Sequence, residues 1–378
     1  MMTVTAVVTC MLRRVEYQAF PAEQTITVRC TAVAGTAVAQ GYGTAVTEAV
    51  ARRKALSEAV ERMLACTPFA LLARPSTSRA TATDARSGPD GARTVPPGCR
   101  LRRYRALDGG SDLTVPLFWS APWVAGTELA EGTLTPPVAR LSSTIGWAVA
   151  PTPAAALRGA VLELTELLDH GAFLYRSLAV APAGRSGTAA TDRAEVETIP
   201  LSFVGGTPVV LVVARAGRRM PATGLGAAQT VAAATERALL ELAQADTMWR
   251  ANETAVPAER YFLRRFERWP LLLRCATLDF EPVPAPVPGR APEAPEQELA
   301  AAGVRVWADT GELEVTAPEL PTTRLHFAHA VSRPQPLLGL VRAGVPVFDM
   351  GEVRKILDDR VRRQRPLDRR PAGRGTAR

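Results

Sequence analysis

One spacing pattern constrains this chain more than any other feature. A glycine, followed at fixed offsets by alanines and then by acidic residues, occurs three times, beginning at Gly41, Gly146 and Gly224. The residues seventeen and twenty positions after each glycine are Glu58 with Glu61, Glu163 with Glu166, and Glu241 with Gln244. The three copies align without an insertion, and alanine bias alone does not place three glutamates at one offset. We therefore infer one structural unit that the chain uses three times.

Each copy reads as a β-rich run, a glycine turn and a long alanine-rich helix. The expected helices span residues 48–66, 154–168 and 230–246, and the expected strands span 25–39, a short run ending at Thr144, and 208–214. The run 208–214 (PVVLVVA) is apolar on both faces, so we expect a central strand there. Strands that alternate with helices indicate an α/β fold.

The polar residues of the three helices predict a shared site. Residues three apart on a helix lie on the same face, so each Glu-x-x-Glu pair directs two carboxylates one way. A single pair of this kind is usually a solvated helix surface. The third copy favours a polar cavity instead, because Arg237, Glu241 and Gln244 lie in a window otherwise rich in alanine and leucine.

Several carboxylates around one cavity need cations, and hard oxygen ligands favour magnesium or calcium. Magnesium usually completes its coordination with water and substrate phosphates, which makes a nucleoside triphosphate its natural companion. The glycine turns at 41–43 and 224–226 precede helices, where backbone amides can approach phosphate.

Composition shifts divide the chain into four parts. Residues 1–280 form the expected main body, in which 75–99 is a polar loop that we expect to be exposed. Alternating prolines predict an extended linker at 281–298. Residues 299–353 contain short β-like runs and are expected to be a C-terminal section of the same domain. Residues 354–378 form a basic tail.

Charge, cysteines and hydropathy exclude several classes of function. The net charge of +8 is concentrated in the arginine-rich tail, which favours a solvated arm over docking on nucleic acid or an acidic partner, although the second alternative stays open. Five scattered cysteines show no zinc or dithiol spacing and favour a reducing compartment. His326 and His329 lack a nearby acidic or cysteine partner, so we interpret them as polar residues at a strand end, not metal ligands. No apolar run approaches the ~20 residues of a membrane span, and a cytoplasmic protein is expected.

At these residues the chain resembles the YcaO family. Three motifs carry the resemblance: GYGTAVTEAVARRKALSEAVER, IGWAVAPTPAAALRGAVLELTE and GLGAAQTVAAATERALLELAQ. The resemblance covers about residues 25–249 and the C-terminal strands. It implies a YcaO-like α/β fold in which strand–glycine turn–helix units surround a central nucleotide cavity. It also implies an ATP- and Mg²⁺-dependent enzyme that activates a peptide backbone amide and forms an azoline, a thioamide or an amidine.

The resemblance also implies roles for individual residues. Glu58, Glu61, Glu163, Glu166 and Glu241 would hold magnesium, Arg237 would neutralise phosphate charge, Gln244 would be a neighbouring polar support, and Gly41 and Gly43 would lie at the nucleotide. Lys54 would supply a positive charge to the nucleotide or pair with Glu58. The chain departs from the family pattern at four positions, which are Tyr42, Lys54, Ile145 and Leu167.

The favoured interpretation is an active enzyme that matures a ribosomally made precursor peptide together with a leader-peptide-binding partner protein. The four departures support an alternative, a catalytically silent YcaO-like subunit that binds the peptide or a sister enzyme. A basic factor that binds nucleic acid or protein is the third interpretation. The substrate peptide, the nucleophile and the oligomeric state, including a homodimer, stay open at this stage.

Overall fold

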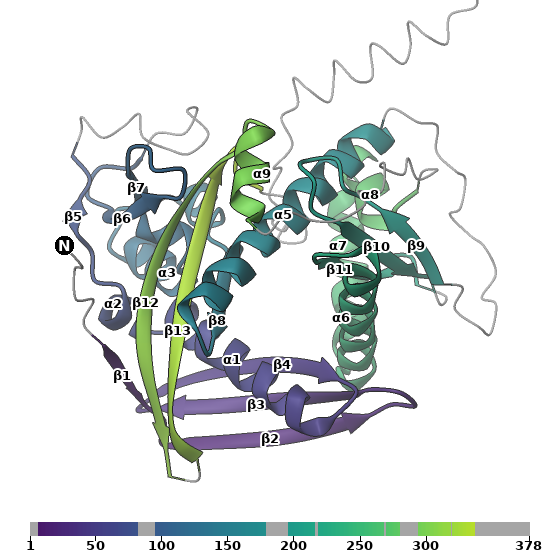
Figure 1. Cartoon of the computed structure of the whole chain (residues 1–378), viewed down its shortest axis with the longest axis horizontal. Coiled ribbons are helices and arrows are strands. Elements are labelled where there is room, and N and C mark those ends of the chain that lie inside the picture. The colour runs from purple at the N-terminus through teal and green to yellow at the C-terminus, as the bar shows by residue number, and fades with distance from the viewer. Residues whose placement is uncertain are drawn as a thin grey trace, which may run out of the picture.

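The computed structural model describes residues 7–81, 95–178, 196–215, 218–267, 270–279, 294–318 and 320–336. In this part of the chain the strands form three sheets (Figure 1). The largest has the order β5 (Ser78–Arg79), β6 (Arg100–Ala106), β12 (Arg305–Ala317), β13 (Leu320–Arg333) and β8 (Trp147–Ala150). Two more strands join its edges: β1 (Val8–Met11) runs parallel to β12, and β7 (Leu113–Pro116) pairs with β6.

The two smaller sheets are antiparallel. One has the order β11 (Ala222–Ala227), β10 (Val209–Ala214) and β9 (Val196–Pro200), and the other has the order β2 (Arg14–Pro21), β3 (Ile26–Ala34) and β4 (Ala37–Ala45). The prediction of a central strand at 208–214 is confirmed, since β10 is the middle strand of its sheet and all six of its residues are buried.

Each of the three long helices packs on a different sheet. Helix α1 (Glu48–Cys66) covers β3 and β4, α5 (Pro153–Leu178) packs on β8 and β13, and α6 (Val231–Ala251) packs on β10 and β11. Figure 1 shows these three helices facing one another across the middle of the molecule. The remaining helices are α2 (Phe69–Ala73), the 3₁₀ helix η1 (Leu117–Trp119), α3 (Pro122–Ala130), α4 (Pro136–Ala139), α7 (Ala255–Phe266), α8 (Pro270–Thr277) and α9 (Pro295–Ala301).

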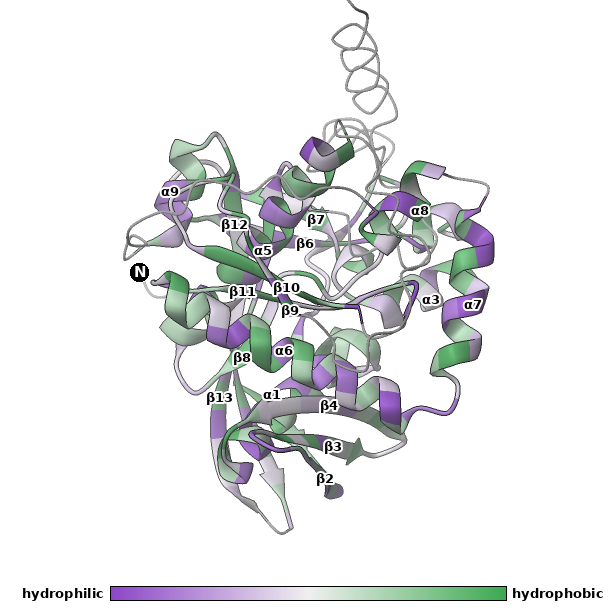
Figure 2. Cartoon of the chain, turned by 90° about the vertical axis from the view of Figure 1, so that its right-hand side faces the viewer, coloured by the Kyte–Doolittle hydropathy of each residue, from purple (hydrophilic) through white to green (hydrophobic). Residues whose placement is uncertain are grey.

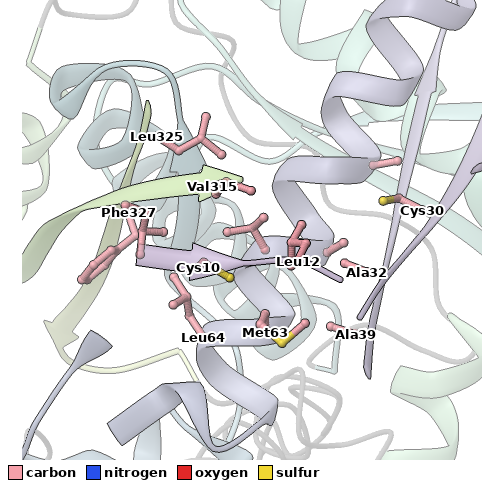
Figure 3. Close-up of a cluster of buried hydrophobic side chains, with 14 of the residues drawn as sticks. Cys10, Leu12, Cys30, Ala32, Ala39, Met63, Leu64, Val315, Leu325 and Phe327 are labelled. Carbon is pink, nitrogen blue, oxygen red and sulfur yellow. The ribbon is translucent and has the colours of Figure 1, made fainter. Parts of the chain in front are cut away.

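A hydrophobic cluster joins the N-terminal sheet to the largest one. Figure 3 shows Met63 and Leu64 of α1 beside Cys10, Val315 and Phe327 from β1, β12 and β13. These side chains are at most 2% exposed, so the C-terminal hairpin and the first helix share one core. None of the five cysteines, all of which lie in the described part of the chain, forms a disulfide. Among the described residues, no helix combines the length and the apolar character that a membrane crossing requires.

The helix predictions are confirmed, with two extensions. Helix α1 has the predicted bounds, whereas α5 continues ten residues beyond 168 and α6 continues five beyond 246. The strand predictions need correction. Residues 25–39 form parts of two strands, β3 and β4, because Gly35 adopts a positive φ of 58° and turns the chain back. The strand expected to end at Thr144 is absent from the described residues, and β8 begins after Gly146 instead.

The glycine turns are also wrong as predicted. Gly41 and Gly43 lie inside β4, and Gly224 and Gly226 lie inside β11. A Cβ atom on Gly41 would lie 2.1 Å from the backbone nitrogen of Ala59, and one on Gly224 would lie 1.9 Å from the carbonyl oxygen of Ala238. Glycine is therefore required here because strand and helix backbones touch, and the first and third units are strand–helix pairs in direct contact.

The expected linker and loop are described only at their ends. Residues 280–293 and 82–94 lie outside the described residues. The end of the expected extended linker is helical, because Pro295 begins α9 and the acidic Glu296 and Glu298 occupy its first turn, where carboxylates stabilise a helix. The described ends of the 75–99 loop are not fully exposed, since Val95 and Cys99 are buried in a hydrophobic cluster.

Candidate functional site

The first glutamate of each unit bonds back to the start of its own unit. Oε2 of Glu58 accepts a hydrogen bond from the amide of Tyr42 at 2.9 Å, Oε2 of Glu163 accepts from Gly146 at 3.0 Å, and Oε2 of Glu241 accepts from Leu225 at 3.1 Å. In the first and third units, the glycines let the strand approach the helix backbone closely, so the strand amides lie within hydrogen-bonding distance of the glutamate on that helix. One oxygen of each carboxylate is thus fixed, and among the described residues the second oxygens of Glu163 and Glu241 have no hydrogen-bond partner.

In the second and third units, the second polar position contacts the next unit. Oε1 of Glu166 on α5 accepts from the amide of Ala227 on β11 at 2.7 Å. Oε1 of Gln244 on α6 accepts from the hydroxyl of Thr44 on β4 at 3.3 Å. In the first unit the neighbouring Arg62 makes this link, by donating to the hydroxyl of Thr144 just before Gly146. The three units therefore close into a ring: first to second, second to third, and third to first.

This ring brings all five predicted glutamates into one electrostatic neighbourhood. Burial, and then the charge of Glu61, raise the pKa of Glu163, and burial followed by the charge of Glu241 raises that of Glu166. Burial also raises the pKa of Glu61 to about 8, with Arg62 opposing it and Glu58 adding to it. Three helices thus direct carboxylates that repel one another into the same region.

The exposure of these carboxylates is graded. Glu166 is buried, Glu58, Glu61 and Glu163 are half-buried, and Glu241 is exposed. Burial and the charge of Glu58 raise the pKa of Glu241, and Arg237 and Lys54 oppose the rise. The group remains accessible to solvent at the third unit, where Glu241 is exposed.

Two cations face the same region from equivalent positions. Lys54 and Arg237 both lie thirteen residues after the leading glycine of their units, a correspondence that was readable in the sequence. The Lys54 ammonium donates to the carbonyl oxygen of Thr44 at 3.0 Å, and the Arg237 guanidinium donates to Oε1 of Glu166 at 3.4 Å. Burial and the proximity of Arg237 lower the pKa of Lys54, which places the two cations close to each other.

Sequence reasoning missed the part that Arg62 plays. Its guanidinium donates to Oε1 of Glu58 at 3.3 Å and to Thr144, and its charge opposes the pKa rise of Glu61. Arg62 follows Glu61 directly and lies four residues after Glu58, a spacing that places it on the same helix face. Because the second unit has Leu167 at the equivalent position, the comparison of copies did not identify it.

A buried chain of donors supports the second unit. Arg74 donates to the hydroxyl of Tyr104, the hydroxyl lies 2.6 Å from Nδ1 of His329, and Nε2 of His329 lies 3.0 Å from the carbonyl oxygen of Ile145. A carbonyl oxygen only accepts, so Nε2 carries the proton and Nδ1 accepts from the tyrosine. This chain fixes the Ile145 carbonyl next to Gly146, the residue whose amide holds Glu163.

The expectation that His326 and His329 lie at a strand end is wrong, since both lie inside β13. His329 is 2% exposed, and burial lowers its pKa well below the usual value, so it is neutral and hydrogen-bonded on both ring nitrogens. The sequence interpretation of a histidine without a metal role agrees with this packing.

The spacing of the acidic residues bears on the kind of metal that they could hold. In the part of the chain that the structure describes, no three His, Cys, Asp or Glu residues lie close enough to hold an ion by themselves. Magnesium does not need such a cage, because it keeps waters and bridges one or two carboxylates to phosphates. The donor set fits a cation that a nucleotide brings with it, and does not fit a resident structural metal.

Comparisons with known proteins bear on the fold. The sequence matches no family model and no curated protein. Among solved structures, YcaO from Methanopyrus kandleri bound with AMPPCP and Mg²⁺ aligns over 83% of this chain and 84% of its own, with a TM-score of 0.51 and 21% identity. A chain of the E. coli microcin synthetase McbBCD complex aligns over 84% of this chain and 87% of its own, with a TM-score of 0.53 and 12% identity. The same complex with pro-MccB17 bound gives a TM-score of 0.52. This chain therefore has the fold of the YcaO proteins.

Proposed function

We propose that this protein binds a nucleoside triphosphate with magnesium at the five-glutamate site and uses it to activate a backbone amide of a ribosomally made peptide. One observation carries the proposal: three repeated units close into a ring and direct five carboxylates and two cations into one region. The shared fold supports it, because one structure with that fold is described as bound with AMPPCP and Mg²⁺.

The carboxylates Glu58, Glu61, Glu163, Glu166 and Glu241 are the proposed magnesium ligands. Backbone amides hold one oxygen of Glu58, Glu163 and Glu241. Among the described residues the second oxygens of Glu163 and Glu241 are available, whereas that of Glu58 accepts from Arg62 at 3.3 Å. A bound cation would offset the burial and the mutual repulsion that raise the pKa values of Glu61, Glu163, Glu166 and Glu241. When bound, magnesium would supply charge neutralisation for the transferred phosphoryl group.

The two cations are the proposed phosphate contacts. Arg237 is 45% exposed at its side chain, so its guanidinium can keep the Glu166 contact and still meet a phosphate. Lys54 adds a second positive charge from the facing helix. Gln244 contributes by joining α6 to β4, and Gly41 and Gly43 contribute by letting β4 approach α1, which holds Glu58 in place.

Nucleotide-dependent thermal stabilisation tests this proposal. AMPPCP with Mg²⁺ should raise the unfolding temperature of the wild-type chain, since a ligand at a hundredfold its Kd adds about 2.7 kcal/mol to stability. Glu163→Gln should lose most of this gain. Glu48→Gln, on the exposed first turn of α1 and paired with Arg52, is the matched control and should retain it. Stabilisation of Glu163→Gln equal to that of wild type would contradict the site, and absence of any wild-type shift would refute nucleotide binding.

The substrate and its partners belong to the same proposal. A ribosomal precursor peptide, presented in the cytoplasm by a leader-peptide-binding partner protein, is the proposed substrate, and the structure described as McbBCD with pro-MccB17 bound supports a complex of this kind. Mass spectrometry of a candidate peptide, after incubation with this protein, its partner and ATP, should show loss of one water for ring closure. Exchange of an oxygen for a sulfur would identify thioamide formation instead.

A catalytically silent scaffold is the second candidate. Within the described residues no carboxylates are grouped tightly enough to hold an ion, and both Lys54 and Arg237 already have partners in the protein. A scaffold would bind the peptide or a sister enzyme equally well with Glu163→Gln, and would show no nucleotide-dependent stabilisation. The thermal experiment with the two glutamate variants therefore separates the two candidates.

A further inference from the structure

A cleft on another face of α6 is not explained by the glutamate site. Its volume is about 740 Å³, and its walls come from the C-terminal part of α6, from α7 and from residues 218–219. Figure 2 faces this side of the molecule and shows α7 beside the end of α6. Arg250 on α6 lies nine residues beyond Glu241, which is about 13 Å along the helix and half a turn around it. The cleft is therefore a separate site.

Arginine dominates the charge of this cleft. Arg218, Arg219, Arg250, Arg260 and Arg264 line it, together with the acids Asp246, Glu259 and Glu267. Two of the acids are already occupied: Asp246 pairs with Arg218 at 2.8 Å and with Arg250 at 2.7 Å, and Glu259 accepts from the amide of Met220 at 2.8 Å.

Three arginines of the lining have no acidic partner among the described residues. Arg219, Arg260 and Arg264 are exposed, and in the part of the chain that is described none of them forms an ion pair. Arg260 and Arg264 are one helical turn apart, so both point along the same face of α7. Glu267, three residues after Arg264 at the end of the same helix, is the third acid of the lining. The five arginines therefore outnumber the three acids and leave a surplus of positive charge in the cleft.

The rest of the lining is apolar and aromatic. The guanidinium of Arg218 lies 4.2 Å from the centre of the Trp249 ring, Val256 is 45% exposed, and Leu263 adds apolar surface. A volume of this size falls in the range of sites that bury an organic ligand, and a small inorganic anion would not fill it. Arginines that alternate with apolar surface suit a polypeptide that carries both carboxylates and apolar side chains.

We propose that this cleft binds an acidic polypeptide segment, whose carboxylates pair with Arg219, Arg260 and Arg264 and whose apolar side chains pack on Trp249, Val256 and Leu263. Arginine and carboxylate form charge-assisted, often bidentate hydrogen bonds, which give this pairing both affinity and orientation. The inference goes beyond the nucleotide proposal and does not depend on it, because binding here needs neither nucleotide nor catalysis.

Fluorescence anisotropy of the full chain tests the proposal. The probes are a fluorescein-labelled peptide that contains glutamate and leucine, and the same peptide with every glutamate replaced by glutamine. The wild-type chain should bind the glutamate peptide at least about tenfold more tightly, and Arg260→Glu with Arg264→Glu should remove about tenfold or more of that affinity. Arg13→Glu with Arg140→Glu, two exposed arginines on other surfaces, makes the same change in net charge and should stay within about twofold of wild type.

Thermal unfolding of both double variants checks that they fold, as expected for exposed side chains. Equal affinity for the glutamate and glutamine peptides would overturn the proposal. So would an equal loss in the control variant, because general charge would then explain the binding. A labelled single-stranded RNA is the alternative ligand. If it bound more tightly than the glutamate peptide and lost this binding in Arg260→Glu with Arg264→Glu, the cleft would be a nucleic-acid site and the proposal would be overturned.

Discussion

The contact between strand and helix at Gly41 gives a demanding test of the repeated unit. In Gly41→Ala the added Cβ would lie 2.1 Å from the backbone nitrogen of Ala59 and 2.4 Å from the carbonyl oxygen of Ala55. Non-bonded carbon contacts normally begin near 3.5 Å, so α1 must move away from β4 by more than about 1 Å. Both obstacles are backbone atoms, and a side-chain rotation cannot relieve them.

The expected loss combines two effects. Overpacking of this kind costs about 1–3 kcal/mol, and the hydrogen bond from Tyr42 to the Glu58 carboxylate, worth about 1.5–3 kcal/mol, is weakened by the same movement. Gly41→Ala should therefore lower the free energy of unfolding by about 3 kcal/mol or more, and should weaken nucleotide binding in proportion to the displacement of Glu58. Gly224→Ala should behave alike, because its Cβ meets Ala238 at 1.9 Å.

Urea unfolding followed by far-UV circular dichroism measures these losses. Gly126→Ala is the matched control, since a Cβ on this helical glycine meets nothing within 4 Å, and it should be neutral or gain up to about 1 kcal/mol. If Gly41→Ala were as stable as Gly126→Ala, the direct contact between β4 and α1 would be refuted, together with the common geometry inferred for the units.

Three further predictions follow from other residues. Burial raises the pKa of Asp169 to about 8, so the native state keeps a proton that the unfolded state releases near pH 4; its contribution to stability is complete below that pH and is lost as the pH rises through 8. Asp169→Asn should flatten this part of the pH dependence of urea unfolding, and an unchanged slope would contradict the assignment. Arg74→Met should cost about 1–3 kcal/mol or more, because it removes buried donors from Ser120, Tyr104 and Asp309, although Arg102 still pairs with Asp309. The exposed Arg103→Ala should change stability by less than about 0.5 kcal/mol, and similar losses in both would argue against the buried network. A double-mutant cycle with Thr44→Val and Gln244→Ala should give a coupling of about 0.5–1 kcal/mol, and additive losses would show that this link does not close the ring.

Much of the site could be predicted because its signal is local. In each unit, the glutamate seventeen residues after the glycine accepts a hydrogen bond from an amide at or next to that glycine. The spacing between the two residues is therefore set within a single unit and is visible in the sequence. Alanines such as Ala55 and Ala59 favour a helix by propensity, and their small side chains allow the close packing that the structure shows. The predicted first and last residues of α1 agree with the structure. The agreement of these signals identified the five glutamates as members of one group.

The glycines show where a local signal was insufficient. A Gly-x-Gly ahead of a helix is compatible with a turn and with a strand that a helix backbone touches, and the sequence does not distinguish them. Only the partner decides: Gly43 in β4 meets the backbone of Ala51 and Ala55, which is a tertiary contact. The same limit applies to 25–39, where the turn at Gly35 separates two strands that the residue pattern joined.

The buried network could not be predicted, because its members are far apart in sequence. Arg74, Tyr104, Asp309 and His329 come from four segments, and their burial depends on β6, β12 and β13 meeting beside α2. An arginine after a short helix normally predicts solvent exposure, whereas Arg74 is fully buried because three neighbours accept its donors. The arginine cleft was equally hidden, since the sequence pattern drew attention to the basic tail.

A crystal of the protein grown with AMPPCP and Mn²⁺ in place of Mg²⁺ would test the central claim most directly, through the anomalous scattering of manganese. A manganese peak is expected between α1, α5 and α6, within about 2.1 Å of a carboxylate oxygen from one or two of the five glutamates and beside the nucleotide phosphates. A nucleotide bound elsewhere, for example in the arginine cleft, or manganese without a glutamate ligand, would contradict it.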